Sequence, residues 1–261
     1  MRSLSVVNIE MGDSPLVGAA IHDGHAVRRE VADLLCIDEA TRLREEDPHT
    51  ASLSAVAPTR IVGLTSRFEV DLNRPRDKAV YLVPDDCWGL KIWKSPPAED
   101  LVARSLQEYD DSYGAVFDAL ADVAWRHGRF VVFDVHSYNH QRGGPGSACA
   151  PASENPEVNV GTGSMDRERW GRLADRFIAG LRQFDYKGRH LDVRENVKFQ
   201  GGNFSRWIHK KFPGQGVALA IEFKKCFMNE WTGEADRRQL QCLRQALEST
   251  CAGVLEELDR S

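Results

Sequence analysis

The chain has 261 residues with 34 basic and 39 acidic side chains, which give a net charge of −5 and a pI of about 5.9. This balance argues against a protein that coats nucleic acid, because such proteins carry a basic excess. Hydrophobic residues make up 42% and charged residues 28%, which excludes a disordered or collagen-like chain. No Pro-, Ser- or Gly-rich linker divides the sequence, so we expect a single domain over residues 1–261.

The hydrophobic pattern alternates between short and long segments. In chain order it predicts strands at 16–21, 60–64 and 68–72, a helix at 98–127, a strand at 129–135, a helix at 170–184, a strand at 217–221 and a helix at 240–254. The predicted strands 16–21 and 217–221 are apolar at every position, and 60–64 and 129–135 contain continuous apolar runs, which are typical of strands buried on both faces. Strands that alternate with long helices predict a layered α/β fold with a largely parallel sheet.

Neither the N-terminus nor the rest of the chain carries an apolar run that suits a signal peptide or the ~20 residues of a membrane-spanning helix. We therefore expect a cytoplasmic protein that does not enter membranes. The six cysteines form no C-x-x-C pair, and we expect them to be reduced thiols that mostly fill the core.

Polar residues stand at the ends of three predicted strands, where His22, His136 and Glu222 follow apolar runs. Ligands of open α/β sheets bind beyond the carboxyl ends of the strands, and imidazole is a common zinc ligand. Asp134 lies two residues before His136, so on a strand it shares the same face and is suited to orient the imidazole. The alternative for each histidine is a structural role, with its ring bonded to a backbone carbonyl.

Three other segments carry residues suited to a binding site. The acidic cluster 45–49 offers a third metal ligand, although the pattern alone favours a solvated turn. Asn73 and Arg74 follow the predicted strand 68–72, where an arginine can bind a carboxylate through two hydrogen bonds or form a surface ion pair. Two glycines in 200–203 allow close backbone approach to a ligand, or simply a turn and a helix cap. The chain has neither a phosphate-binding G-x-x-x-x-G-K-[ST] loop nor a G-x-S-x-G elbow.

A series of short motifs runs in order through about residues 15–235. They are Ile21-His22-Asp23-Gly24, Asp47-Pro48-His49, Ser66-Arg67, Asp71-Leu72-Asn73-Arg74-Pro75, Asp134-Val135-His136-Ser137, Asn159-Val160-Gly161-Thr162, Phe199-Gln200-Gly201-Gly202, and a closing stretch from Ile221-Glu222 to Phe227-Met228-Asn229-Glu230. In this order the motifs resemble the N-formylglutamate amidohydrolase (formylglutamate deformylase) family. The family is similar to the zinc carboxypeptidases, so the resemblance implies a three-layer α/β/α domain of the phosphorylase/hydrolase-like fold with a mostly parallel mixed sheet.

The resemblance also implies a metal site. One Zn²⁺ ion per chain would be held by His22, His136 and a carboxylate. Asp47 matches the family's acidic ligand best, and Glu46, one residue away, offers the same chemistry.

The remaining site residues are likewise implied by the resemblance. Glu222 corresponds to the general base, and Asn73 with Arg74 to the pair that binds the substrate's carboxylate. Arg67 is a candidate donor for the oxyanion of the tetrahedral intermediate.

The implied activity is zinc-dependent hydrolysis of the amide bond of an N-acyl amino acid such as N-formylglutamate, a carbon–nitrogen bond other than a peptide bond. Residues 81–89 differ from the tyrosine-proline-glycine stretch of the best-known deformylases, so the acyl group stays open. Two alternatives remain: a metallopeptidase or acyl-amino-acid hydrolase of the same fold, and a binding protein that retains the fold without turnover. The expected partner is a small-molecule substrate, with neither nucleic acid nor membrane.

Overall fold

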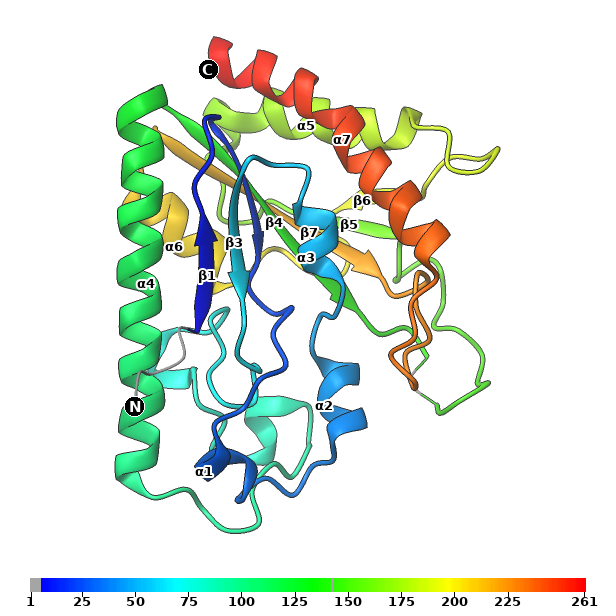
Figure 1. Ribbon diagram of the computed structural model, residues 1–261. Helices are drawn as coiled ribbons and strands as arrows, with labels where there is room; N and C mark the ends of the chain where they lie inside the picture. Colours follow the sequence, from blue (N-terminus) through cyan, green and yellow to red (C-terminus); the bar gives the residue numbers. More distant parts are fainter. Residues whose placement is uncertain (1–5, 142) are drawn as a thin grey trace.

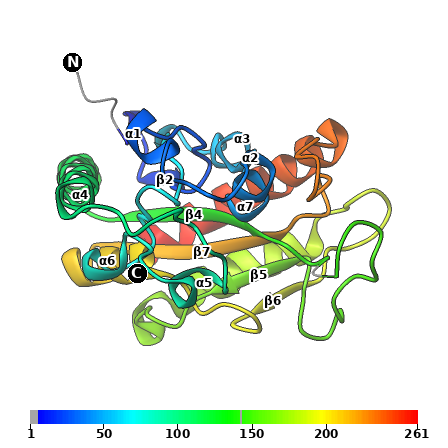
Figure 2. The same cartoon turned by 90° about the horizontal axis from the view of Figure 1, so that it is seen from below.

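The centre of the molecule is a seven-stranded mixed sheet, seen in a computed structural model that describes residues 6–141 and 143–261 (Figure 1). The strand order is β1 (Val7–Glu10), β3 (Thr59–Gly63), β2 (Leu16–Ala20), β4 (Phe130–Tyr138), β7 (Gly216–Lys224), β5 (Val158–Gly161) and β6 (Val193–Glu195). The four central strands β3, β2, β4 and β7 run parallel. β1 and β5 pair antiparallel with their neighbours β3 and β7, and Figure 2 shows β4, β7, β5 and β6 lying in this order.

Helices cover both faces of the sheet. One face packs against α4 (Glu99–His127) and α6 (Asn203–Lys211), and the other against α3 (Thr50–Ser54), α5 (Arg167–Gln183) and α7 (Arg237–Arg260). The short helices are α1 (Arg29–Ala32), α2 (Glu39–Glu45), η1 (Arg76–Lys78) and η2 (Pro84–Cys87). The predicted three-layer α/β/α fold with a mostly parallel mixed sheet is confirmed. Across the described residues, no helix is long and apolar enough to cross a membrane.

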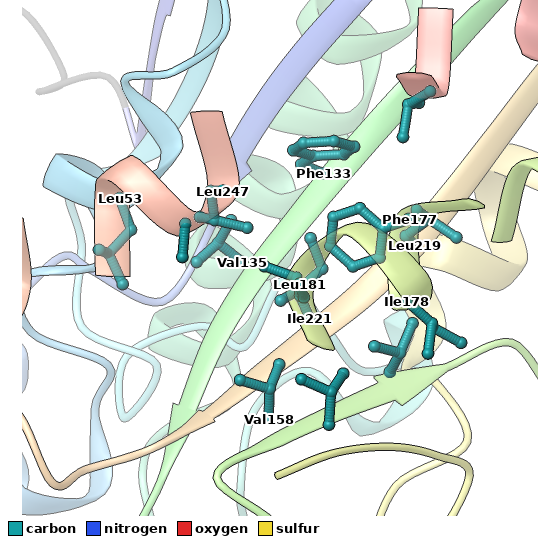
Figure 3. Packing of buried hydrophobic residues seen from close by; sticks show 14 of the residues in the cluster. Leu53, Phe133, Val135, Val158, Phe177, Ile178, Leu181, Leu219, Ile221 and Leu247 are labelled. Atoms are coloured by element: carbon teal, nitrogen blue, oxygen red, sulfur yellow. The ribbon is translucent and has the colours of Figure 1, made fainter. Parts of the chain in front are cut away.

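Strand β4 divides the core into two halves. All nine of its residues are buried, as the continuous apolar run predicts. Its odd-numbered residues, such as Phe133, pack with Phe177 of α5 and Leu247 of α7 (Figure 3). Its even-numbered residues Phe130 and Val132 face α4 and α6, and toward the carboxyl end the same face carries polar side chains instead.

The strand predicted at 68–72 is wrong, because this segment forms consecutive turns. An alternating strand would expose its polar side chains to solvent, but Glu69 and Asp71 are as deeply buried as the neighbouring apolar residues. Glu69 accepts a hydrogen bond from the backbone of Arg28 at 2.6 Å, and Asp71 bonds to His22. Two buried carboxylates need such partners, and the turns bring them within reach.

Three strands, β1, β5 and β6, escape prediction because each is only three or four residues long and includes polar positions. The expected core position of the cysteines is wrong for three of them. All six are free thiols, and Cys36, Cys149 and Cys226 are exposed.

Candidate metal centre

Three side chains from distant parts of the sequence meet beyond the centre of the sheet. Nδ1 of His136 lies 3.0 Å from Oδ2 of Asp47, and Nδ1 of His22 lies 3.4 Å from the same oxygen. All three residues are buried, and one potential ligand atom of each lies within 4.8 Å of the others. The fold thus brings together the three residues that the resemblance implied as metal ligands.

The parallel sheet explains why the two histidines are close. His22 follows β2 by two residues and His136 lies on β4, and these neighbouring strands run in the same direction. The sequence pattern ended the predicted strands before His136 and Glu222, but β4 and β7 continue past both residues. Asp47 is brought in after α2, where its backbone N–H donates to the carbonyl of His22 at 3.0 Å.

The far nitrogen of each imidazole is held by a carboxylate. Nε2 of His22 lies 2.7 Å from Oδ1 of Asp71, and Nε2 of His136 lies 2.9 Å from Oδ1 of Asp134. Carboxylates in this position orient metal-binding histidines and leave the other ring nitrogen free for the ion. The contact of Asp134 was predicted from its spacing. Asp71 was missed as a site residue, although it opens the motif 71–75 and follows an apolar residue.

The alternative ligand Glu46 points to different partners. Its carboxylate accepts a hydrogen bond from Ser66, pairs with His25 and lies 3.6 Å from Arg42. It is fully buried, and Glu45 and Asp47 are buried beside it, so the expectation of a solvated acidic turn is wrong. Among the described residues, Asp47 is the carboxylate that joins the two histidines.

The donor set fits a zinc ion. Catalytic zinc is bound by three protein ligands, commonly two imidazoles and a carboxylate, and keeps a further position for water or substrate. Burial disfavours the charged form of Asp47, but the hydrogen bonds and charges of His136 and His22 outweigh it and lower its pKa. Burial opposes ionisation of Asp71 as well, yet neighbouring Arg67 and His22 hold its pKa well below the usual range. Both carboxylates therefore stay ionised, as a cation site requires.

A buried lysine forms hydrogen bonds with the backbone of the segment that carries Asp47. Lys225 is 1% exposed, and its Nζ donates to the carbonyls of Arg44 at 2.6 Å and Glu46 at 2.7 Å. Burial lowers the pKa of this ammonium to about 8. Lys225 was not assigned to the site from the sequence. Its place directly after a buried strand is the signal that could have found it.

A pocket of about 420 Å³ opens over the candidate metal centre, and Glu222 lines it. Glu222 is the register partner of His136 across β4 and β7. Within residues 6–141 and 143–261 the carboxylate of Glu222 has no hydrogen bond or ion pair. The neighbouring Lys224 donates to the carbonyl of Asn155 at 3.0 Å. Burial raises the pKa of Glu222 to about 7.

Arg67 lines the same pocket and is held in place. Its guanidinium donates to Oδ2 of Asp71 at 2.8 Å and to the hydroxyl of Tyr81 at 3.2 Å, and it stacks 5.0 Å from the ring centre of Trp88. Arg67 therefore connects the pocket wall to the carboxylate that orients His22.

Asn73 and Arg74 also reach the pocket, but they follow a turn and not the predicted strand. Oδ1 of Asn73 accepts from the backbone N–H of Phe204 at 2.9 Å, and its Nδ2 lies 3.5 Å from Nε2 of His136. Arg74 donates to the carbonyl of Asp86 at 3.2 Å. The expected alternative, a surface ion pair of Arg74 with an acid, is absent from the described contacts.

The glycine pair at 201–202 provides the helix cap that the sequence allowed, and it also lies in the pocket wall. Gly202 is the N-cap of α6, and both glycines line the pocket. A Cβ atom at Gly202 would lie 2.1 Å from Oδ1 of Asn73. Glycine is therefore required for Asn73 to occupy the pocket wall.

The pocket has further basic and aromatic residues that sequence reasoning did not assign. These are Trp88, Tyr138, Lys198, Phe199 and Arg206. Trp88 has a φ of 56°, a left-handed conformation that is uncommon for a bulky residue. Residues held in such conformations cluster at binding sites, and Trp88 lies in the segment 81–89 that departs from the best-known deformylases.

Comparisons with known proteins agree with this architecture. A search of curated proteins gave no match. The structure of N-formylglutamate amidohydrolase from Ralstonia eutropha JMP134 superposes with a TM-score of 0.74 at 17% identity, covering 98% of this chain and 99% of that one. A gene product of Agrobacterium tumefaciens has a TM-score of 0.69 at 17% identity, with 97% and 96% covered. These likenesses show the shared fold.

A match to a family model gives a more specific relationship than the shared fold. A model of the N-formylglutamate amidohydrolase family matches residues 14–228, which include every residue of the candidate metal centre and Glu222. The chain therefore belongs to the N-formylglutamate amidohydrolase family.

Proposed function

We propose that this protein hydrolyses the amide bond of an N-acyl amino acid, with N-formylglutamate as one candidate, and that one zinc ion is held by His22, Asp47 and His136. The observation that carries the proposal is the arrangement of this donor set in one pocket with Glu222, whose carboxylate has no hydrogen-bond or ion-pair partner among the described residues. Membership in an amidohydrolase family supports the reaction class. The donors and Glu222 all come from one sheet and its loops, which supports one catalytic domain over residues 1–261.

Glu222 moves the proton in this scheme. A zinc ion in the site would supply Lewis acidity, which polarises an amide carbonyl and acidifies water. Glu222 takes the proton of the attacking water and delivers it to the nitrogen of the leaving amine. A carboxylate whose pKa is near 7 can both accept and return a proton at neutral pH, and burial supplies that shift here.

Two arginines bind the substrate in this proposal. Arg67 contributes a guanidinium N–H to the oxyanion that forms at the acyl carbon, and its bonds to Asp71 and Tyr81 keep it in position. Arg74, with Asn73, binds the α-carboxylate of the amino acid part. Products are a carboxylic acid and a free amino acid.

The direct test is an amine-release assay on a panel of N-acyl amino acids. N-formyl, N-acetyl and N-succinyl derivatives of glutamate and aspartate are incubated with zinc-loaded protein, and the free amino acid is quantified by chromatography. Release that stops on treatment with a chelator and returns with zinc supports the proposal. Protein that contains zinc and releases no amino acid from any member of the panel contradicts it, and dipeptide substrates would then test the peptidase alternative.

Replacing Arg74 by alanine is expected to weaken the apparent binding of acidic substrates by ~2–4 kcal/mol, because charge-assisted hydrogen bonds are lost. Lysine at position 74 should restore only part of the loss, since an ammonium does not reproduce the planar guanidinium. Steady-state kinetics with a substrate and its carboxamide analogue measure the effect. The matched control is Arg76→Ala, which breaks an exposed ion pair with Asp110 and should leave substrate binding unchanged. Equal losses for Arg74→Ala and Arg76→Ala would contradict the assignment.

Replacing Asp71 or Asp134 by asparagine is expected to lower zinc affinity by about 10–100-fold, because each carboxylate orients one histidine through its far nitrogen. Competition with a chromophoric chelator measures the dissociation constant without reference to activity. Asp110→Asn, an exposed position, is the control for a general loss of charge. Unchanged zinc affinity in folded Asp71→Asn and Asp134→Asn variants would show that the histidines do not need these partners.

A further inference from the structure

The segment 81–89 presents an apolar side chain to the pocket over the candidate metal centre. Trp88 directly follows η2, lines the pocket and is 50% exposed. Leu82 and Val83 of the same segment are half exposed as well. Large exposed hydrophobic side chains that gather in one place mark a binding surface, whereas single ones are common on any protein. The segment therefore offers an apolar surface to a bound molecule.

The ring of Trp88 is held in place although it is exposed. Cζ of Arg67 lies 5.0 Å from its centre, and the ring of Tyr81 meets it edge to face at 6.4 Å. The backbone of Trp88 is left-handed, with a φ of 56°. A bulky residue keeps this conformation where the surrounding contacts hold it. A side chain that is already ordered loses little conformational entropy when a ligand covers it.

The contact with Arg67 indicates which part of a substrate lies against Trp88. Arg67 is the proposed donor to the oxyanion, and the oxyanion is bonded to the acyl carbon. The acyl substituent is bonded to the same carbon. Arg74, the proposed partner of the α-carboxylate, donates instead to the carbonyl of Asp86 and lies with its Cζ 5.8 Å from the ring centre of Tyr81. The ring of Trp88 therefore belongs to the acyl side of the scissile bond.

The pocket has room for an acyl group larger than formyl. Its volume of about 420 Å³ falls in the range of ~300–1,000 Å³ that is typical of pockets for drug-sized ligands. A formyl group carries only a hydrogen atom on its carbonyl carbon, so it leaves the exposed part of Trp88 in water. An apolar chain covers this surface, and the removal of apolar surface from water favours binding.

We propose that the acyl part of the substrate is an apolar group of several carbon atoms and that Trp88 selects it. This inference rests on the proposed function, because the position of the acyl group follows from the role of Arg67 as donor to the oxyanion. Trp88 contacts the substrate and takes no part in making or breaking bonds. The other occupant to test is an apolar amino-acid side chain, for which Tyr138 and Phe199, with ring centres 5.5 Å apart, offer a second surface in the pocket.

The test measures binding separately from turnover. Zinc-loaded Glu222→Gln protein is titrated by calorimetry with N-formyl-, N-acetyl-, N-butanoyl- and N-hexanoylglutamate. The butanoyl derivative is expected to bind about tenfold more tightly than the formyl derivative, because each fully buried methylene gives about a fourfold gain. If this variant does not fold, wild-type protein titrated with formate, butanoate and hexanoate gives the same comparison. Dissociation constants that do not fall with acyl length would overturn the inference.

Variants of Trp88 test whether this residue makes the selection. Trp88→Gly, made in the Glu222→Gln protein, removes the ring, and glycine adopts the left-handed backbone without strain. The ratio of the formyl to the butanoyl dissociation constant should return to near one, and Trp88→Phe should keep part of the gain. A general effect of the substitution on Arg67 cancels in this ratio. Trp125→Ala, which removes a tryptophan 83% exposed on α4, is the control and should keep the full gain. An unchanged ratio in Trp88→Gly would overturn the assignment.

Release of glutamate by the wild type separates this inference from the proposed function. Hydrolysis of the whole series, without a gain in binding for the longer acyl groups, would overturn the inference alone. Tighter binding of the longer acyl groups without release of glutamate would support the apolar subsite and contradict the hydrolysis. If N-formylphenylalanine binds more tightly than N-formylalanine and Trp88→Gly removes this gain, Trp88 contacts the amino-acid side chain and the acyl assignment is overturned.

Discussion

A Glu222→Gln variant is expected to fold, to bind zinc and to lose about 10²–10⁴-fold in turnover, which is the usual contribution of a positioned general base. Glutamine keeps the shape of the side chain and removes only its basicity. The carboxylate of Glu222 has no partner in the described part of the chain, so the substitution breaks no ion pair. Steady-state turnover of an N-acyl amino acid, zinc content and thermal unfolding are measured on the same preparation.

The control for this variant is Lys224→Met. Lys224 lies two residues after Glu222 on β7, but it donates to the carbonyl of Asn155. Lys224→Met is therefore expected to leave turnover unchanged. A folded, zinc-loaded Glu222→Gln enzyme with turnover near that of the wild type would refute the proposed role of Glu222, even if the metal site were correct.

Alanine at His22 or His136 is expected to abolish stoichiometric zinc binding, from close to one ion per chain in the wild type to almost none. Each histidine offers Nδ1 to the same point beside Asp47, and a site left with two protein ligands holds zinc far more weakly. Elemental analysis of protein purified without chelators measures the content. Circular dichroism of each variant shows whether the fold survives.

This chain offers matched controls for the metal site. His25 is three residues from His22 and its Nδ1 pairs with Glu46, so His25→Ala should keep its zinc. Asp47→Ala should lose the metal and Glu46→Ala should retain it, because Asp47, and not Glu46, lies beside both histidines. Equal zinc content in all of these variants would place the metal elsewhere.

Much of the fold and part of the candidate site can be predicted from the sequence. The continuous apolar runs before His136 and Glu222 predict buried parallel strands, and the structure confirms them as β4 and β7. Parallel strands place their carboxyl ends at one edge of a sheet, so these two residues and His22 were expected to lie together. The contact between Asp134 and His136 follows from strand periodicity alone.

Other features depend on contacts between distant segments, which no local pattern encodes. Adjacent carboxylates at 46 and 47 look equivalent in sequence, yet Ser66 and His25 engage the first and the two histidines engage the second. Residues 68–72 have the alternating pattern of a strand but form turns. The burial of Asp71 in these turns depends on partners elsewhere in the chain, which the local pattern does not show.

The sequence by itself determined the layered α/β fold, the family and the residue types at the ends of the central strands, because apolar runs and strand periodicity are local properties. Only the tertiary structure decided that Asp47 lies beside both histidines and that Lys225 hydrogen-bonds to the backbone of the segment carrying it. The physical reason is that the position of a buried charge depends on its partners. Those partners come from other elements and are brought close only when the sheet and its loops assemble.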